Sequence, residues 1–300
     1  MSDGTVQPDL SVVVPSVTGW EDLKGCLDAL ARQRGVTVEA IVVDRLGEPV
    51  LRAVRREFPA VRLVAAPSGT PIPTMRRLGI AVASAPIVGV IEDHVQVPTD
   101  WAARMLEAQR AGADVVGGAV ENGATGRLAY WSAFLCEYGQ SLAPAAGPVD
   151  RLPGNNVTYR RHLLERFSDR LAEDRWENHL HHALAAAGVV LLSRPDIVVS
   201  HCLHITVGQY VQQRYYYSRS FAGQRAAGAG ALRRLALGLG AAALPPVLLW
   251  RIVRAVWRSR RYRLQLLVSL PLIAGYVVVW AAGEVVGAWF GPGDALSKVA

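Results

Sequence analysis

The sequence predicts an α/β protein: a doubly wound, mostly parallel sheet followed by a C-terminal apolar helical membrane segment. Two observations carry this prediction. Residues 11–120 alternate short apolar runs with helical patterns, and repeated β-α units of this length are typical of parallel sheets. Residues 231–300 differ from the rest of the chain because they combine long apolar runs with an excess of basic residues.

The alternating part of the chain supplies the strands and helices. We expect strands at 11–15, 38–44, 61–66 and 87–93, and helices at 20–33, 48–58, 71–84 and 99–110. The run Ile87–Ile91 contains only apolar or small residues, which suits a strand covered on both faces. Further along, we expect a strand at 114–120, a Gly/Ala/Pro-rich loop at 143–153, helices at 161–167 and 174–187, and strands at 189–193 and 197–201.

The net charge of +7 is concentrated in the tail. Residues 1–230 contain 23 basic and 23 acidic residues, whereas residues 231–300 contain nine basic and two acidic ones. A neutral body argues against nucleic acid, which would need a basic groove there, and a basic apolar tail favours an anionic membrane surface. The three widely spaced cysteines suggest no disulfide framework, so a reducing cytoplasm is expected, and the N-terminus lacks a signal-peptide pattern.

We therefore expect a main domain over 1–230 and membrane-associated helices over 231–300. The first apolar segment contains Pro245-Pro246, which favours an interfacial helix at about 235–257 over a membrane span. The second, at about 264–290, is long enough to be a candidate transmembrane helix. Crossing by the first segment would leave the intervening arginines outside, against the positive-inside tendency. The alternative for both segments is a buried apolar helical subdomain.

Glu92, Asp93 and His94 follow the predicted strand that begins at Ile87. The carboxyl ends of strands are where α/β sheets usually bind ligands, and all three side chains can ligate a divalent metal. A metal at this position would hold a diphosphate. The alternative is an acidic turn without a ligand.

Other polar residues occupy comparable positions. Asp44 closes a predicted strand and can accept from a nucleobase or ribose, or serve as a turn residue. Arg76, next to Arg77 on the preceding helix, can meet phosphate oxygens or solvate a helix face. Asn155, in the segment PGNN, can bind sugar hydroxyls or form a turn.

Candidate acid–base groups lie further along the chain. Asp174, after Glu173, can act as a general base toward an acceptor hydroxyl or begin a helix. The group His179, His181 and His182 has a spacing that scatters the rings around a helix, so we reject a zinc site there. Two further histidines, His201 and His204, follow an apolar strand. Either could complete a metal shell, and a structural role is favoured for each.

The segment QQRYYYSR, which contains Gln213, Arg214 and Arg219, is dense in cationic and hydrogen-bonding groups. An arginine there can neutralise a leaving diphosphate, and the tyrosines can pack on a sugar or at the membrane interface. An amphipathic connecting helix is the alternative.

Taken in order, these segments resemble family 2 glycosyltransferases with the GT-A fold. The resemblance rests on SVVVPS, IVVDR, RRLGIAVASAPIVGVIEDH, PGNN, AEDRW and QQRYYYSR, which cover most of residues 10–225. It implies an inverting transfer from a nucleotide sugar, with Asp174 as general base and a divalent metal, Mg²⁺ or Mn²⁺, at Glu92 to His94. It also implies nucleotide-sugar contacts by Pro15, Asp44, Arg76, Glu92, Asp93, Asn155, Gln213 and Arg214.

The acidic motif departs from the family pattern, which usually has Asp at its first and third positions. Glu92 adds a methylene and His94 adds no negative charge when neutral, so Mn²⁺ or a softer ion suits the motif better than Mg²⁺. The expected enzyme lies at the cell membrane with its catalytic domain in the cytoplasm, and its acceptor is lipid-linked or a membrane-proximal saccharide. The rivals are a non-catalytic membrane-bound scaffold and a sugar nucleotidyltransferase. The nucleotidyltransferase ranks lower because the loop after the first strand lacks basic residues.

Overall fold

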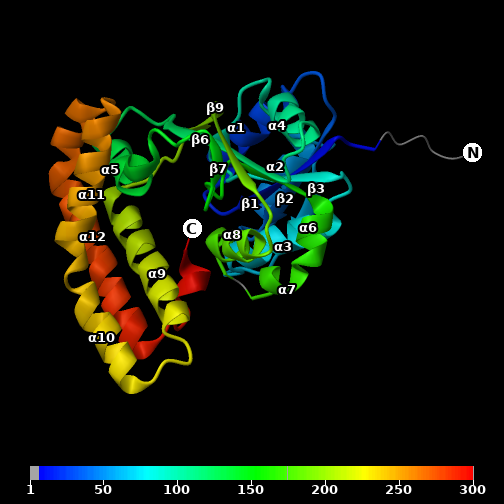
Figure 1. Cartoon of the computed structure of the whole chain (residues 1–300). Coiled ribbons are helices and arrows are strands. Elements are labelled where there is room, and N and C mark those ends of the chain that lie inside the picture. Colours follow the sequence, from blue (N-terminus) through cyan, green and yellow to red (C-terminus); the bar gives the residue numbers. More distant parts are fainter. Residues whose placement is uncertain (1–6, 174, 300) are drawn as a thin grey trace, which may run out of the picture. The chain divides into compact units, whose positions relative to one another are not determined.

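The computed structural model describes residues 7–173 and 175–299, which form two compact units (Figure 1). The first unit contains the chain up to Gly123 together with Ala143–Cys202, and the second contains Ala124–Leu142 and Leu203 onward. This structural division does not coincide with the boundary expected at residue 230. The helices at 128–138 and 207–225 belong to the second unit, so the division of function at residue 230 stays a prediction.

The first unit is built on one sheet with the strand order β3-β2-β1-β4-β8-β6-β9-β5, and β7 pairs with β9. Its first half is parallel: β3 (Arg62–Ala65), β2 (Val38–Asp44), β1 (Leu10–Ser16) and β4 (Ile87–Val90). The connecting helices are α1 (Trp20–Ala31), α2 (Glu48–Glu57) and α3 (Ile72–Val82). The β-α alternation predicted for this part of the chain is confirmed.

The second half of the sheet is mixed, although the sequence predicted a mostly parallel sheet. Its strands are β8 (Val157–Arg160), β6 (Val115–Asn122), β9 (Leu191–His201), β5 (Val95–Gln96) and β7 (Gly147–Val149). Only the pairing of β6 with β9 is parallel there, whereas β8 pairs antiparallel with both β4 and β6. The two strands expected at 189–193 and 197–201 are one strand, β9, with a register shift against β6.

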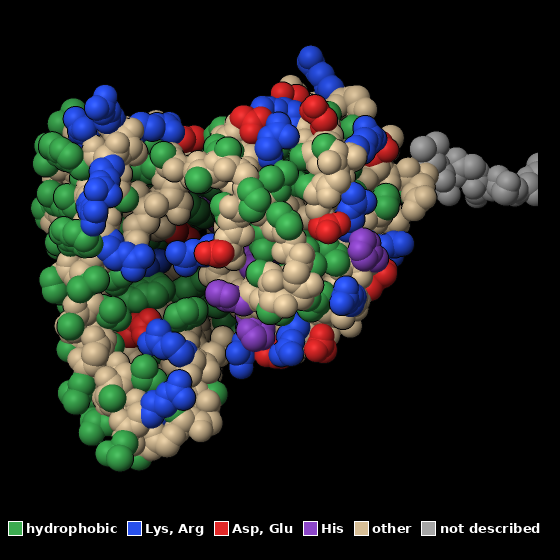
Figure 2. All heavy atoms as spheres, in the orientation of Figure 1, with side chains coloured by type: hydrophobic (Ala, Val, Ile, Leu, Met, Phe, Trp, Pro, Cys, Tyr) green, Lys and Arg blue, Asp and Glu red, His purple; other side chains and the backbone are tan. Residues whose placement is uncertain are grey.

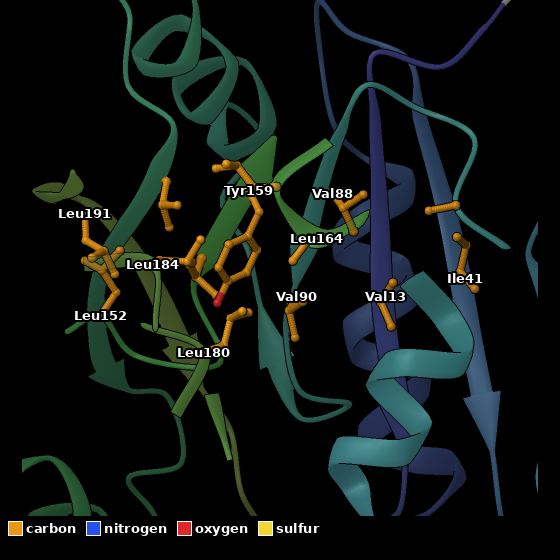
Figure 3. Close-up of a cluster of buried hydrophobic side chains, with 14 of the residues drawn as sticks. Val13, Ile41, Val88, Val90, Leu152, Tyr159, Leu164, Leu180, Leu184 and Leu191 are labelled. Carbon is orange, nitrogen blue, oxygen red and sulfur yellow. The ribbon is translucent and has the colours of Figure 1, made fainter. Parts of the chain in front are cut away.

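Helices cover both faces of this sheet. They are α4 (Trp101–Arg110), α6 (Arg161–Arg166), α7 (Ser168–Leu171) and α8 (Glu177–Ala186), in addition to α1 to α3. Figure 3 shows one apolar cluster, in which Val13, Val90 and Tyr159 of the sheet lie with Leu164 and Leu180. The close approach of α3 to this face depends on Gly79. A Cβ atom there would lie 2.4 Å from Cγ1 of Val13, so a larger residue would push the helix away.

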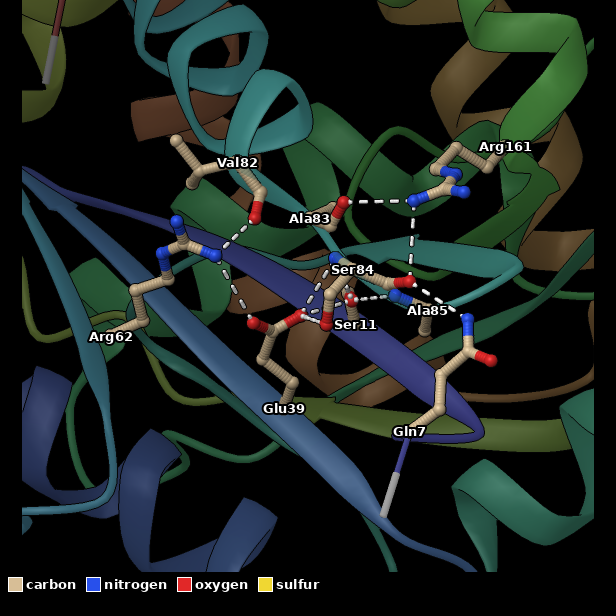
Figure 4. Close-up of polar contacts among 9 residues, drawn as sticks. All are labelled: Gln7, Ser11, Glu39, Arg62, Val82, Ala83, Ser84, Ala85 and Arg161. Carbon is tan, nitrogen blue, oxygen red and sulfur yellow. Dashed lines mark hydrogen bonds and ion pairs between the residues drawn. The ribbon is translucent and has the colours of Figure 1, made fainter. Parts of the chain in front are cut away.

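Polar contacts tie the amino ends of the parallel strands together (Figure 4). The Glu39 carboxylate at the start of β2 accepts hydrogen bonds from the Ser11 hydroxyl of β1 and from the Ser84 backbone and hydroxyl before β4. Arg62 at the start of β3 completes the set with an ion pair of 3.5 Å to Glu39. These contacts stabilise the amino edge of the sheet and leave its carboxyl edge for other chemistry.

The second unit is helical. It contains α5 (Leu128–Tyr138), η1 (Gly139–Ser141), α9 (Val207–Arg225), α10 (Ala231–Ala241), α11 (Leu244–Ser259), α12 (Arg263–Phe290) and η2 (Ala295–Lys298). The expected interfacial helix is two helices, α10 and α11, with a bend of 50° between them. Among the described residues, α12 is the single continuous helix long and apolar enough to cross a membrane. The sequence did not predict α5, because its run LAYWSAFLCEY has no clear apolar stripe.

Candidate metal centre

The candidate site lies at the carboxyl end of β4. This strand ends at Val90, and Glu92, Asp93 and His94 form the turn that leads into β5. The two residues of β5 pair antiparallel with the end of β9, so that Val95 lies opposite His201. The backbone N–H of Cys202 also donates to the carbonyl of His94 at 2.8 Å. This short pairing brings a histidine from the end of β9 to the acidic turn.

Three side chains converge there. The Nε2 atoms of His94 and His201 lie 2.9 Å apart, and their rings meet edge to face. One carboxylate oxygen of Glu92 lies 3.3 Å from Nε2 of His94 and 3.7 Å from Nε2 of His201. Among the described residues, this is the one group of three or more His, Cys, Asp or Glu side chains whose ligand atoms are close enough to hold one metal ion.

Asp93 lies beside this group but outside it. Its Oδ2 accepts hydrogen bonds from the backbone N–H groups of Val17 and Thr18, at 2.6 and 2.8 Å, and its Oδ1 lies 3.1 Å from Nδ1 of His94. The side chain is completely buried. A carboxylate bound to the far nitrogen of a histidine fixes the ring and makes the other nitrogen a better ligand. The structure therefore places Asp93 behind His94, and its predicted role as a direct metal ligand stays a prediction.

Glu92 is held from two sides. The Asn155 side-chain amide, in the turn before β8, donates to Oε2 of Glu92 at 2.9 Å. Arg76 on α3 lies 3.7 Å from Oε1 of Glu92 and forms a closer ion pair, 2.8 Å, with Glu177 at the start of α8. Two residues predicted for nucleotide-sugar binding, Arg76 and Asn155, thus contact the acidic turn directly.

The electrostatics of the two histidines are opposite. Burial favours a neutral His94, but its hydrogen bonds to Asp93 and Glu92 raise the pKa of the ring above its usual range. Burial and the neighbouring charge of His94 lower the pKa of His201. For Glu92, burial opposes ionisation, yet the hydrogen bond from His94 and the charges around it lower the pKa of the carboxyl. Imidazole ligates a metal in its neutral form, so a metal cation bound to Nε2 of His94 would take the place of a proton on that nitrogen.

The donor set fits a divalent metal. Two imidazole nitrogens and one carboxylate oxygen are the ligands that Zn²⁺, Mn²⁺ and related ions accept, whereas Mg²⁺ prefers oxygen alone. All of the candidate ligand atoms lie within 4.8 Å of one another. The residues for such an ion are Glu92, His94 and His201.

Two other predicted contact residues lie in the same unit. Asp44 ends β2, is buried, and accepts from the Ser16 hydroxyl and the Gly47 N–H, both at 2.7 Å. These bonds match the turn role that the sequence left open for Asp44. Pro15 is buried in β1 opposite Val43. These positions do not test the nucleotide contacts predicted for Asp44 and Pro15, which stay predictions.

The remaining predicted site residues are Asp174, Gln213 and Arg214. Asp174 lies outside the described residues, so the structure does not place the predicted base. Gln213 and Arg214 lie on α9 in the helical unit, where the Arg214 guanidinium stacks over Trp280 at 4.1 Å from the ring centroid. Their predicted contact with a diphosphate stays a prediction.

Sequence reasoning underestimated His201. It was expected to be a structural histidine, and it lies instead within the candidate metal group. Its position after an apolar run was the available signal, but β5 has only two residues and left no pattern from which its pairing with β9 could be read.

Comparison with known proteins identifies the fold of the chain. No curated protein sequence matches the chain. The mannosyltransferase PcManGT from Pyrobaculum calidifontis, solved in complex with GDP-Man and Mn²⁺, is similar in fold, with a TM-score of 0.56 and 18% identity over 94% of this chain and 88% of that chain. S. aureus TarS 1-349 has a TM-score of 0.51 and 14% identity over 93% of this chain and 90% of that chain.

These similarities confirm the expected GT-A fold. The sequence profile described as glycosyl transferase family 2 matches residues 11–185, which is more than half of the chain. The chain therefore belongs to glycosyl transferase family 2, and its acidic turn and candidate metal group lie at the carboxyl end of β4.

Proposed function

We propose that this chain is an inverting glycosyltransferase that moves a sugar from a nucleotide-diphosphate sugar to a hydroxyl group of a lipid-linked or membrane-proximal acceptor. The observation that carries the proposal is the convergence of Glu92, His94 and His201 at the carboxyl end of β4 in a chain of this family. Carboxyl ends of strands in open α/β sheets are where nucleotides bind.

Glu92, His94 and His201 would hold a divalent ion, with Asp93 behind His94 and Asn155 beside Glu92. When bound, such an ion neutralises charge that develops on a departing diphosphate. One cationic side chain beside the turn is Arg76, which is buried and already paired with Glu177. We assign to Arg76 the orientation of Glu92 and a contact with phosphate oxygens, since buried guanidinium groups bind both kinds of oxyanion.

The proposed reaction is a direct displacement. The acceptor oxygen forms a bond to the anomeric carbon while the bond from that carbon to the diphosphate oxygen breaks, and its electron pair leaves with the nucleoside diphosphate. The hydroxyl proton passes to the carboxylate of Asp174 as general base. Support for Asp174 comes from its neighbours in sequence: Arg175 and Glu177 line a pocket together with Arg76 and Gly154.

Asp44, Pro15 and Asn155 are proposed contacts for the base, ribose and sugar of the donor, and Gln213 and Arg214 for the diphosphate. The acceptor proposal rests on the apolar helices α10 to α12, which suit a chain that works at a membrane with its catalytic unit in the cytoplasm. A soluble saccharide is the alternative acceptor.

A donor-hydrolysis screen on the detergent-purified chain tests the transferase proposal. GDP-mannose with Mn²⁺ is the first donor, because the similar structure from Pyrobaculum calidifontis holds that pair, and UDP- and dTDP-sugars with Mn²⁺, Zn²⁺ or Mg²⁺ follow. Metal-dependent release of one nucleotide, lost in Asp174→Asn, is the expected result. Nucleotide binding without release, even with membrane extract as acceptor, would favour a non-catalytic scaffold, and no binding would contradict the proposal.

A labelling experiment tests the acceptor separately. With the donor identified, the radiolabelled sugar is offered to a lipid extract and to soluble saccharides in parallel. Label in the organic phase is the expected result. Label confined to the soluble saccharide would leave the transferase proposal standing and overturn the lipid-linked acceptor.

A further inference from the structure

The second unit exposes apolar side chains along three consecutive helices. On α10 they are Leu232, Leu235 and Leu239, and on α11 they are Val247, Trp250 and Trp257. On α12 the exposed members are Leu264, Leu267, Val268, Val278, Trp289 and Phe290. Several of these side chains are more than half exposed, among them Leu232 at 84% and Phe290 at 74%. Figure 2 shows the hydrophobic side chains along this helical unit, with arginines among them.

The opposite face of α12 packs against the polar helix α9. The ring of Tyr276 meets that of Tyr210 edge to face with centroids 4.6 Å apart, and the guanidinium of Arg214 lies over Trp280. Further along α12, the buried carboxylate of Glu284 forms an ion pair with Arg225, whose side chain is 42% exposed.

Two glycines of α12 bring the backbones of these helices close together. A Cβ atom at Gly283 would lie 2.6 Å from the carbonyl oxygen of Tyr215, and one at Gly287 would lie 2.3 Å from the carbonyl oxygen of Arg219. The two helices therefore form one tightly packed pair, and α12 cannot enter a bilayer without α9.

This pairing limits how α12 meets a membrane. The contacts with α9 extend from Tyr276 to Gly287, and the residues of α9 in that stretch include Arg214, Arg219 and Arg225. The longest part of α12 outside that stretch is residues 263–275, which is about 20 Å of helix, whereas the hydrocarbon core is about 30 Å thick. Crossing the bilayer would carry charged α9 side chains into hydrocarbon, where such groups are costly.

The charge on the exposed surface points to an anionic lipid surface. Six arginines lie between the middle of α11 and the start of α12: Arg251, Arg254, Arg258, Arg260, Arg261 and Arg263. Arg254 stacks over Trp250 at 4.9 Å and Arg263 over Trp257 at 4.8 Å. Such pairs suit the boundary between lipid headgroups and hydrocarbon, where the indole meets apolar chains and the guanidinium meets phosphate.

A second copy of the chain suits this surface poorly. The two acidic residues of the segment 231–300 are already paired, Glu284 with Arg225 and Asp294 with Lys298. A symmetric contact between two copies would therefore bring arginines against arginines, which is repulsive.

We propose that the helical unit is a monotopic anchor: α10, α11 and the exposed face of α12 lie in the plane of an anionic bilayer surface, and α12 does not cross it. In this arrangement α12 is not a transmembrane helix. One of its faces packs against α9, and the opposite face contacts lipid. The proposal concerns the membrane alone, so it stands or falls independently of the transferase activity.

Vesicle flotation tests the surface. The full chain is mixed with preformed vesicles of phosphatidylcholine, with and without phosphatidylglycerol, at low and high salt. We expect binding to the anionic vesicles, weakened by salt. In Arg254→Gln/Arg258→Gln we expect partitioning to fall roughly 30-fold, from about 1 kcal/mol for each of the two basic residues at the surface. Leu232→Asp/Leu239→Asp should abolish binding.

A matched control is Val190→Asp, a 51% exposed apolar residue in the first unit, which should bind as the parent chain does. Circular dichroism on each variant confirms the helical fold. Equal binding to neutral vesicles, or loss of binding in the control as well, would overturn the docking surface. Dimer formation that disappears in Leu232→Asp/Leu239→Asp, without vesicle binding, would identify a second copy as the occupant instead.

Accessibility at the two ends of α12 tests the orientation. Leu267→Cys and Trp289→Cys are introduced singly into a chain in which Cys26, Cys136 and Cys202 are replaced by serine. After binding to preformed vesicles, a membrane-impermeant maleimide should reach both cysteines from outside. Lipid-borne quenchers should report a shallow depth for a fluorophore attached to Leu267→Cys and for one attached to a third single variant, Val278→Cys. Protection of one end until the vesicles are opened, or a mid-bilayer depth at Val278, would show a crossing helix and overturn the proposal.

Discussion

The first unit contains two groups of histidines, one that belongs to the candidate metal group and one that does not. His94 and His201 are 107 positions apart in sequence, yet their Nε2 atoms are 2.9 Å apart. His179, His181 and His182 are neighbours on α8, and they do not form a metal-binding group among the described residues. Nearness in sequence therefore did not indicate which histidines act together, because adjacent helical positions point in different directions.

The surroundings of each group explain the difference. His181 is completely buried, its Nε2 lies 2.8 Å from the hydroxyl of Tyr159, and the N–H of Leu152 approaches its other nitrogen. Both ring nitrogens thus have partners, and the ring is a core residue. The Nε2 atoms of His94 and His201 instead point at each other and at Glu92, so that three candidate metal-ligand atoms lie close together.

The largest expected effect is the loss of metal binding in the first group. His201→Ala and Glu92→Ala each remove one candidate ligand, and we expect the affinity for Mn²⁺ or Zn²⁺ to fall by more than about 100-fold, beyond what is typical for residues behind a ligand. Isothermal titration calorimetry of the full chain in detergent measures it. His181→Gln is the control from the other group, and equal losses in all three variants would contradict the assignment.

Asp93→Asn should have a smaller effect on the same measurement. An amide can still meet Nδ1 of His94 but carries no charge, so we expect metal affinity to fall by roughly 10- to 100-fold. With Co²⁺ as a probe, the absorption spectrum should keep the shape of the parent chain if Asp93 only positions His94. A changed ligand-field spectrum would show that Asp93 itself binds the metal.

The pH dependence of unfolding should report His181. Burial lowers the pKa of this ring to about 4, below the ordinary 6.5. The folded state keeps this ring neutral, which costs no free energy above pH 6.5. As the pH falls from 6.5 toward 4, the ring binds a proton in the unfolded state but not in the folded state, so the free energy of unfolding decreases. We expect about 2 kcal/mol of the free energy of unfolding to disappear between pH 7 and pH 5. Denaturant titrations at both values, with His181→Gln as comparison, should show a flatter dependence in the variant; identical slopes would contradict the assignment.

The smallest effect is expected at His179. Its Nε2 lies 3.0 Å from the carboxylate of Glu173, and both side chains are about 30% exposed. Partly exposed pairs contribute little, so His179→Ala should change the free energy of unfolding by less than about 1 kcal/mol and leave metal affinity unchanged. A larger loss of affinity would mean that the two histidine groups are coupled.

Local patterns of apolar and polar residues in the sequence predicted much of the fold. The strands β1 and β2 were predicted within one residue because apolar runs bounded by polar residues mark them clearly. The short strands β5, β7 and β8 were missed, since two to four residues carry no periodicity. These strands make the second half of the sheet mixed, and their pairing depends on contacts with distant parts of the chain.

The sequence by itself determined that this is an α/β family 2 glycosyltransferase with an acidic turn at the carboxyl end of β4, because these features follow from motifs that are contiguous in the chain. Only the tertiary structure decided that His201 joins Glu92 and His94 while Asp93 turns toward Val17 and Thr18. The physical reason is register: pairing β5 with β9 sets which side chains face the turn, and a shift of one residue would point His201 to the other face.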